Sequence, residues 1–154
     1  LYEYPLIVKG VNTLFEIHQH LFQDVYSWAG KKRTVEISKE GKQFFPTSFF
    51  NNAFQYIDQL ILEYKSIPKR NKRGVADKLA EILDHVNYLH PFREGNGRSQ
   101  REFLRLLAFE KGYSLNLNPP DNKGVYDRYM QGTIESEVKI LADLIDELLI
   151  LSGE

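Results

Sequence analysis

The chain of 154 residues carries a formal net charge of −1, which gives it no overall electrostatic reason to bind nucleic acid or an anionic membrane. Its residues are 42% hydrophobic and 13% aromatic, enough to fill a core, so disorder of the whole chain is excluded. The absence of cysteine excludes a disulfide framework and a thiolate metal site, and it suits a reducing cytoplasm.

The length fits one domain, so we expect a single domain over residues 1–154. No apolar run reaches the ~20 residues that a membrane-spanning helix needs. No signal-peptide pattern opens the chain, so no membrane partner is expected. Because the first residue is Leu1 rather than Met, we expect the chain to be a piece of a longer protein.

The first elements in chain order are a helix and a hairpin. Apolar residues at helical spacing predict an amphipathic helix over residues 12–24. The alternation over residues 33–37 predicts a short strand, and residues 39–42 supply a turn. Residues 43–45 are then the return strand, which Pro46 ends.

Helices dominate the rest of the chain. Thr47 and Ser48 are typical helix N-caps, residues 66–74 form a basic connector expected to be a solvated loop, and Gly112 is typical of a position just after a helix. The sequence therefore predicts a mainly α-helical bundle with one small β-hairpin. The remaining predicted helices cover residues 47–65, 75–89, 98–111, 122–131 and 134–151.

A segment rich in reactive side chains joins two of these helices. Gly95, Asn96 and Gly97 fall where the second helix begins, and the unpaired N–H groups of a helix start bind anions. Arg98 and Arg101 lie in its first turn, where cations oppose the helix dipole and a bound triphosphate would reverse that cost. This segment, called the motif loop below, is residues 90–101, His-Pro-Phe-Arg-Glu-Gly-Asn-Gly-Arg-Ser-Gln-Arg.

Three more side chains of the motif loop have predicted roles in metal binding, proton transfer or anchoring of the loop. Glu94 suits Mg²⁺, which takes one carboxylate and completes its shell with phosphate oxygens and waters. A neutral imidazole at His90 can accept a proton from an attacking hydroxyl. Phe92 is predicted to anchor the loop in the core. Taken singly, each polar residue has an ordinary explanation as a cap, a turn or a solvated side chain, but together they are the inventory for phosphoryl or nucleotidyl transfer.

The other histidines indicate no metal site. His85 and His90 are five residues apart, so on a helix they diverge by roughly 140° and cannot form an i, i+4 metal pair. His18 and His20 face different ways on the first helix and are expected to be satisfied or solvated imidazoles. A zinc hydrolase is therefore disfavoured.

The motif loop resembles the signature of the Fic (filamentation induced by cAMP) family, H-x-F-x-[D/E]-G-N-G-R-x-x-R, at every specified position. A chance match to eight specified positions in a chain of this length is on the order of one in a hundred million. Residues 21–30 and the pair Arg33-Thr34 also resemble the upstream part of bacterial Fic domains. The likeness covers most of residues 10–150.

The resemblance implies a compact, mainly α-helical fold and, as in most members, transfer of AMP from ATP to a Ser, Thr or Tyr hydroxyl of a target protein. It implies that His90 deprotonates the hydroxyl, which attacks the α-phosphate so that pyrophosphate leaves. Glu94 would hold Mg²⁺ at the α- and β-phosphates. The adenine is expected beyond the motif helix, near Tyr126 and Tyr129.

The phosphates have implied partners in the motif loop. The backbone of Gly95, Asn96 and Gly97 would form the anion hole, with the Asn96 side chain orienting the α-phosphate. Arg98 and Arg101 would hold the β- and γ-phosphates.

The hairpin resembles the family's flap, which aligns a stretch of target chain by strand pairing. Its target-docking residues would be Lys42, Gln43, Phe44 and Phe45.

Many family members are inhibited by a glutamate in the pattern [S/T]-x-x-x-E-[G/N], which pairs with the second motif arginine, here Arg101. Residues 133–137 give T-x-x-x-E, but Val138 follows, so this helix is not expected to inhibit. The glutamate is expected either upstream of Leu1 or on a separate, antitoxin-like protein. A bacterial toxin-like enzyme, or an effector secreted into a host cytoplasm, fits this arrangement.

Other functions stay open on the same scaffold. They are transfer of phosphate, as in Doc-type kinases, transfer of UMP or phosphocholine, removal of AMP, and nucleotide binding without catalysis. The intact Gly95-Asn96-Gly97 sequence favours AMP over phosphate transfer, and the intact His90 argues against a pure binder.

Overall fold

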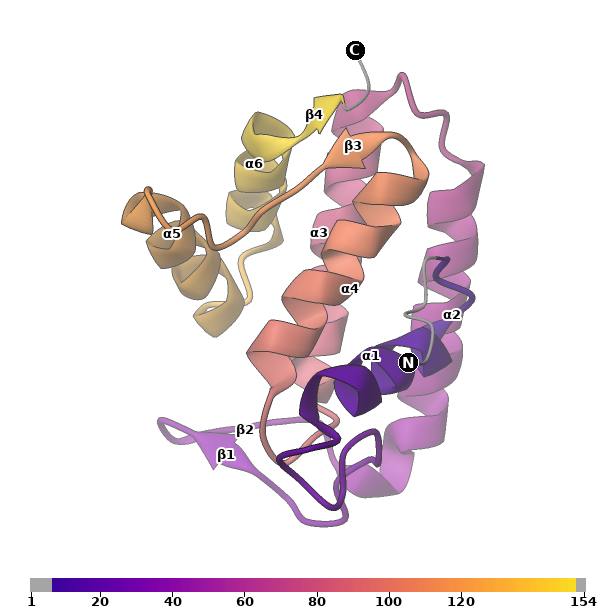
Figure 1. Ribbon diagram of the computed structural model, residues 1–154, viewed down its shortest axis with the longest axis vertical. Helices are drawn as coiled ribbons and strands as arrows, with labels where there is room; N and C mark the ends of the chain where they lie inside the picture. Colours follow the sequence, from indigo (N-terminus) through magenta and orange to yellow (C-terminus); the bar gives the residue numbers. More distant parts are fainter. Residues whose placement is uncertain (1–6, 152–154) are drawn as a thin grey trace.

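The computed structural model describes residues 7–151, and one long helix, α3 (Lys72–Leu89), runs through the middle of it. Helices α2 (Phe50–Ser66), α4 (Asn96–Glu110) and α6 (Val138–Leu148) all pack against α3 (Figure 1). This central position follows from the sequence of α3, because its apolar residues form a stripe wide enough to be covered from several sides.

The other elements surround this centre. Helix α1 (Val11–Phe22) lies across the start of α4, and α5 (Lys123–Ile134) packs on α6 (Figure 1). The strands within residues 7–151 form two separate two-stranded antiparallel sheets. This architecture confirms the predicted fold class, a mainly α-helical bundle with a small β-hairpin. The short elements are β1 (Ser38–Lys39), β2 (Lys42–Gln43), η1 (Thr47–Phe49), β3 (Tyr113–Ser114) and β4 (Ile150–Leu151).

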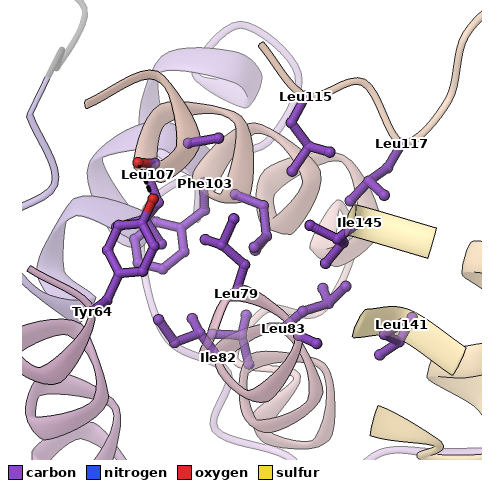
Figure 2. Close-up of a cluster of buried hydrophobic side chains, with 14 of the residues drawn as sticks. Tyr64, Leu79, Ile82, Leu83, Phe103, Leu107, Leu115, Leu117, Leu141 and Ile145 are labelled. Carbon is purple, nitrogen blue, oxygen red and sulfur yellow. Dashed lines mark hydrogen bonds between the residues drawn. The ribbon is translucent and has the colours of Figure 1, made fainter. Parts of the chain in front are cut away.

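The core lies between α3 and its helical neighbours (Figure 2). Leu79 of α3, which is 0% exposed, lies in this cluster with Phe103 and Leu107 of α4. The one polar atom drawn from a side chain there is also satisfied, since the Tyr64 hydroxyl donates to the Leu107 carbonyl oxygen at 2.6 Å. The core therefore holds α3 and α4 in a fixed relation, and the motif loop joins these two helices.

The strand predicted over residues 33–37 is wrong. The hairpin forms later, with Ser38 opposite Gln43 and Lys39 opposite Lys42. Its turn is Glu40-Gly41, and both residues have positive φ, 53° and 80°, as a two-residue hairpin turn of the I′ type requires. The predicted turn is thus confirmed. The earlier segment is not a strand because Arg33 is buried and its backbone N–H donates to Pro91 rather than to a neighbouring strand.

The return strand is also shorter than predicted. Strand β2 ends at Gln43, and Phe44 and Phe45 follow it as irregular chain. The Phe44 N–H still donates to the Ile37 carbonyl at 3.0 Å, but the Phe45 N–H turns to Tyr88 of α3, also at 3.0 Å. The hairpin is therefore tied at its base to the end of α3.

The single helix predicted over residues 134–151 is wrong as well. Ser136 has a positive φ of 52°, which breaks the helical path between α5 and α6. After α6 the chain forms β4, in which Leu151 pairs with Tyr113 of β3. Periodicity cannot reveal this pairing, because the two strands are short and far apart in the sequence.

Besides α6, three helices start two or more residues away from the predicted position. A 3₁₀ turn, η1, occupies Thr47–Phe49 before α2, with no side-chain cap at its start. Helix α3 begins at Lys72, earlier than predicted, because the Asn71 side chain accepts from the Gly74 N–H at 3.0 Å. Helix α4 begins at Asn96, inside the motif loop. None of the helices within residues 7–151 is both long and apolar enough to cross a membrane.

The core makes a direct prediction for stability. Leu79→Ala is expected to lower the free energy of unfolding by about 2–5 kcal/mol, because it removes buried methyl groups and leaves a cavity. The matched control is Leu62→Ala on α2, whose side chain is 64% exposed and whose loss is expected to cost less than about 0.5 kcal/mol. Denaturant titrations followed by circular dichroism measure both, and equal effects would contradict the assignment of the core.

Candidate active site

The motif loop leaves α3 through a left-handed residue and enters α4 through another. His90 continues the helical bonding, since its N–H donates to the Val86 carbonyl at 3.0 Å, but its φ is 45°. Gly95 has φ 82°, and a Cβ placed there would lie 2.5 Å from Cε2 of Phe22. Position 95 therefore requires glycine both for its backbone geometry and for its contact with α1.

Two reciprocal hydrogen bonds close the loop. The Phe92 N–H donates to Asn96 Oδ1 at 2.9 Å, and Asn96 Nδ2 donates to the Phe92 carbonyl at 2.7 Å. Both residues are buried, with Phe92 0% and Asn96 7% exposed. Phe92 thus lies in the core, as its predicted role of anchor requires. The role that the structure gives the Asn96 side chain is loop closure, and its contact with an α-phosphate stays a prediction.

The His90 imidazole is half-buried under the flap. Its ring stacks on the Phe44 ring, with centroids 3.7 Å apart and planes 7° from parallel. Its Nδ1 atom is buried and has no hydrogen-bond partner. Burial, and secondly the positive charges of Arg33 and Lys39, lower the pKa of His90 from 6.5 to about 4. At neutral pH the imidazole is therefore uncharged and able to accept a proton.

The first turn of α4 offers N–H groups and cations together. The first helical hydrogen bond runs from the Ser99 N–H to the Gly95 carbonyl, so the N–H groups of Asn96, Gly97 and Arg98 precede it. The Arg98 guanidinium lies 5.5 Å from the centre of the Phe22 ring.

The second motif arginine has a similar setting. The Arg101 guanidinium lies 5.4 Å from the Tyr126 ring centre and 5.5 Å from that of Tyr129. Among residues 7–151, neither Arg98 nor Arg101 forms an ion pair with a carboxylate. This collection of donors and positive charge suits a polyanion.

Glu94 is exposed directly before this helix start. No cluster of three or more potential metal ligands exists in the described part of the chain, so an ion bound by protein side chains alone is not indicated there. A single accessible carboxylate beside an anion site does fit Mg²⁺, which takes its other ligands from phosphates and waters.

Two cavities meet at Arg101. One, of about 270 Å³, lies between the flap and α5, and is lined by His90, Gly97 and Arg101 among others. The tyrosines expected near the adenine, Tyr126 and Tyr129, line its far side. The other cavity, of about 470 Å³, is more open and lies against α1 and the loop before α5. Its lining residues are His20, Leu21, Arg98, Arg101, Glu102, Arg105, Leu115, Asn116 and Leu117.

The flap forms the rim of the first cavity. Lys42 and Phe44 line it, whereas Gln43 is exposed in β2 and Phe45 lies beneath the flap against Tyr88. The Lys42 ammonium group donates to the Ile134 carbonyl and the Ser136 hydroxyl, each at 3.3 Å. The flap and the turn between α5 and α6 therefore touch across the cavity.

The segment considered for self-inhibition borders the first cavity, but its glutamate does not line it. Thr133 lines the first cavity, but Glu137 is exposed at the start of α6. The Arg101 guanidinium contacts tyrosine rings rather than this carboxylate.

Sequence reasoning missed two residues that support the loop. His18 is 0% exposed, its Nε2 donates to the Glu94 carbonyl, and its Nδ1 accepts from the Gly30 N–H, both at 2.9 Å. Burial lowers its pKa, which keeps this neutral arrangement. Arg33, 2% exposed, donates to the His90 carbonyl at 2.6 Å. The only signal for Arg33 was the resemblance around residues 21–34, and His18 lies outside that segment.

The sequence is similar to that of a known protein family and to several of its members. The sequence profile of the Fic/DOC family matches residues 10–108. VbhT of Bartonella schoenbuchensis, a protein adenylyltransferase, is 37% identical over 101 residues, which cover 66% of this chain and 21% of VbhT. Protein y4lH of Sinorhizobium fredii, a probable protein adenylyltransferase, is 33% identical over 133 residues, which cover 86% of this chain and 67% of y4lH.

A third relative, the probable protein adenylyltransferase Fic of Escherichia coli, is 33% identical over 110 residues, which cover 71% of this chain and 55% of that protein. The chain thus spans only part of these relatives, between 21% and 67% of their lengths.

Two solved structures share the fold. BepC of Bartonella tribocorum, with bound AMPPNP, has a TM-score of 0.78 at 19% identity, covering 99% of this chain and 79% of that chain. The N-terminal Fic domain of a Bartonella quintana effector, with bound ADP, has a TM-score of 0.79 at 21% identity, covering 99% and 78%. The helical arrangement, the motif loop, the profile match and these relatives lead to one conclusion: the chain belongs to the Fic/DOC family.

Proposed function

We propose that the protein transfers AMP from Mg-ATP to the hydroxyl of a Ser, Thr or Tyr residue of another protein. The observation that carries the proposal is the shared cavity, in which an uncharged histidine and the anion-binding start of α4 face the same space. The names of the relatives as adenylyltransferases support the choice of AMP. The target hydroxyl belongs to a protein that pairs with the flap.

His90 is proposed as the general base. Because Nδ1 is buried, Nε2 is the nitrogen that takes the proton from the target hydroxyl. The hydroxyl oxygen then forms a bond to the α-phosphorus of ATP while the bond between the α-phosphorus and the bridging oxygen breaks. Pyrophosphate leaves with that electron pair, and the proton stays on His90 until it is released to solvent.

The start of α4 is proposed to hold the phosphates. The N–H groups of Asn96, Gly97 and Arg98 donate to the α-phosphate oxygens, where negative charge grows during the attack. The guanidinium group of Arg101, between the two cavities, binds the leaving phosphates together with Arg98. Glu94 would hold Mg²⁺, which when bound supplies positive charge to the phosphate oxygens.

The flap is proposed to place the target chain. In the described part of the chain its sheet has only two strands, so each strand has one edge whose backbone groups can pair with an extended segment. Phe44 lies on the His90 ring, so the paired segment would pass close to the base. Lys42, Gln43, Phe44 and Phe45 are therefore the proposed docking residues.

Transfer of phosphate, UMP or phosphocholine would use the same base. The chemical group that becomes attached to the target protein distinguishes these reactions from AMP transfer. Incubation with lysate proteins and ATP radiolabelled at the α-position is expected to label protein, whereas the γ-label is not. Label from the γ-position alone would indicate a kinase. No label from either would contradict the proposed function and would leave transfer of UMP or phosphocholine, removal of AMP, or nucleotide binding without catalysis.

The base is tested in the same assay. His90→Ala is expected to reduce labelling by at least about a hundredfold, the usual contribution of a general base. His85→Ala is the matched control, since His85 lies on α3, which ends just before His90, lines neither of these two cavities and contacts Tyr56. Near-normal labelling by the His90 variant would refute the assigned base, and labelling in EDTA would refute the need for Mg²⁺.

The ionisation of His90 gives an independent prediction. In a histidine-labelled sample without nucleotide, NMR titration is expected to give His90 a pKa of about 4, below its ordinary 6.5. Adding Mg²⁺ with a non-hydrolysable ATP analogue is expected to raise this pKa, because nearby negative charge favours the imidazolium. The His90→Ala spectrum assigns the resonance. A pKa near 6.5 that ignores the nucleotide would place the imidazole away from the phosphates.

We also propose that a small antitoxin-like protein inhibits the enzyme by placing a glutamate on Arg101. Arg101 lines both cavities, so a carboxylate entering from the open cavity would compete with the leaving phosphates for the same guanidinium. The absence of cysteine suits action in a cytoplasm, whether of the producing cell or of a host.

If a separate protein inhibits the enzyme, removing that protein is expected to raise the enzyme's activity. If a partner supplies the glutamate, the full-length protein is expected to be weakly active when co-expressed with its neighbouring gene products and strongly active after their removal. Self-labelling with α-labelled ATP measures both states. Strong self-labelling in the presence of every co-purified partner would remove the basis of this proposal.

A further inference from the structure

Arg33 is the only lysine, arginine, aspartate or glutamate that is buried within residues 7–151. Its side chain is 0% exposed, and the nearest carboxylate, Glu36, is 3.7 Å away and itself largely exposed. A charge so removed from water needs compensation by hydrogen bonds. The question is which groups provide it.

Carbonyl oxygens from three segments provide it. Arg33 Nε donates to the His90 carbonyl at 2.6 Å, and Nη2 donates to Leu89 at 3.2 Å, both at the end of α3. The same Nη2 donates to the Phe45 carbonyl at 2.6 Å, and Nη1 donates to Val35 at 2.7 Å. One planar guanidinium thus joins the motif loop to both arms of the flap.

The hydrogen bonds of Arg33 at the end of α3 fix the backbone of His90, the proposed base. The last carbonyls of a helix lack intrahelical partners and carry the negative end of its dipole, so a buried cation is favourable there. The two peptides that follow His90 are each held by Arg33, the first through the Nε bond to the His90 carbonyl and the second through the Arg33 N–H bond to the Pro91 carbonyl at 2.7 Å. These bonds fix the left-handed conformation from which the imidazole projects.

The hydrogen bonds of Arg33 at the flap fix the segment on which the target protein would dock. The Phe45 peptide is held by Arg33 at its carbonyl and by Tyr88 at its N–H. Phe44, one residue earlier, places its ring on the His90 imidazole. Because the same guanidinium holds Phe45 and His90, the flap cannot shift along α3 without breaking these bonds.

We propose that Arg33 is a positioning residue that sets the distance between the flap and His90, and hence between a docked target and its base. The proposal rests on the proposed function for its catalytic consequence. Arg33 lines neither cavity, and its hydrogen bonds to the motif loop and to the flap go to backbone carbonyls, so it positions these segments without touching the space between them.

The test is Arg33→Lys, which keeps the charge but replaces the planar fork by one nitrogen that cannot reach all of these carbonyls. Tyr64→Phe is the matched control, because it removes a buried bond from a side chain to a carbonyl, 2.6 Å long, between α2 and α4. Thermal unfolding gives the midpoint temperature of each variant. The measurements that follow are made well below the lower of the two midpoints, so that both variants are folded.

Two readouts separate positioning from stability. In Arg33→Lys, exchange of the Phe44 and Phe45 amide hydrogens is expected to accelerate about tenfold or more relative to core amides of α3. The His90 ring protons are also expected to lose the ring-current shift that stacking on Phe44 produces. Tyr64→Phe is expected to leave both unchanged. Unchanged exchange and unchanged His90 shifts in Arg33→Lys, with only a lower midpoint, would overturn the proposal.

Labelling with α-labelled ATP and lysate proteins then reports the catalytic consequence. If wild type labels protein, Arg33→Lys is expected to label about tenfold less or worse, and Tyr64→Phe equally well. Full labelling by Arg33→Lys would overturn the proposal while the proposed function stands. If wild type labels nothing, the proposed function fails, and exchange and ring shifts still decide whether Arg33 positions the flap. Arg33→Gln replaces Arg33→Lys if the latter does not fold, and failure of both to fold would overturn the proposal.

Discussion

The reciprocal hydrogen bonds between Asn96 and Phe92 are the constraint on which the candidate site depends. They close a short connection between two long helices, so that α4 starts immediately after the turn and its first N–H groups precede the first helical hydrogen bond. The burial of the Phe92 ring ties this closed turn to the core. This one turn determines where the first cavity, the two motif arginines and His90 lie.

The closed turn also explains the electrostatics of the region. Arg98 and Arg101 lie at the positive end of a helix dipole and are not paired with carboxylates in residues 7–151. Aromatic rings of α1 and α5 lie against their guanidinium groups instead, which orients the cations without neutralising them. An arrangement of this kind costs stability in the free protein, and the phosphates of the proposed ATP substrate would offset that cost.

The helices and the motif loop were predictable because their signals are local. Apolar spacing predicted the helical bundle, and the glycines with Asn96 predicted a turn at the start of a helix. The turn Glu40-Gly41 was predictable for the same reason, since a two-residue turn needs positive φ and Gly41 tolerates it.

What could not be predicted depends on partners distant in the sequence. Arg33 sits in an alternating segment that favours a strand, but its guanidinium binds carbonyls at Leu89 and His90. His18 looked like any helical histidine, yet it holds the carbonyl of Glu94. The pairing of β3 with β4 joins two-residue segments from separate parts of the chain. No local pattern encodes which distant backbone atom a buried donor will meet.

The contact between Lys42 and the turn after α5 has a consequence for how molecules enter. These hydrogen bonds are exposed and 3.3 Å long, so their net strength is at most that of an ordinary bond, about 1 kcal/mol. Each such bond is broken in about one molecule in six at room temperature, and both are broken in about one in forty, by the Boltzmann factor. This contact between the flap and the turn after α5 therefore breaks through thermal motion, and it would not by itself exclude the proposed nucleotide from the first cavity.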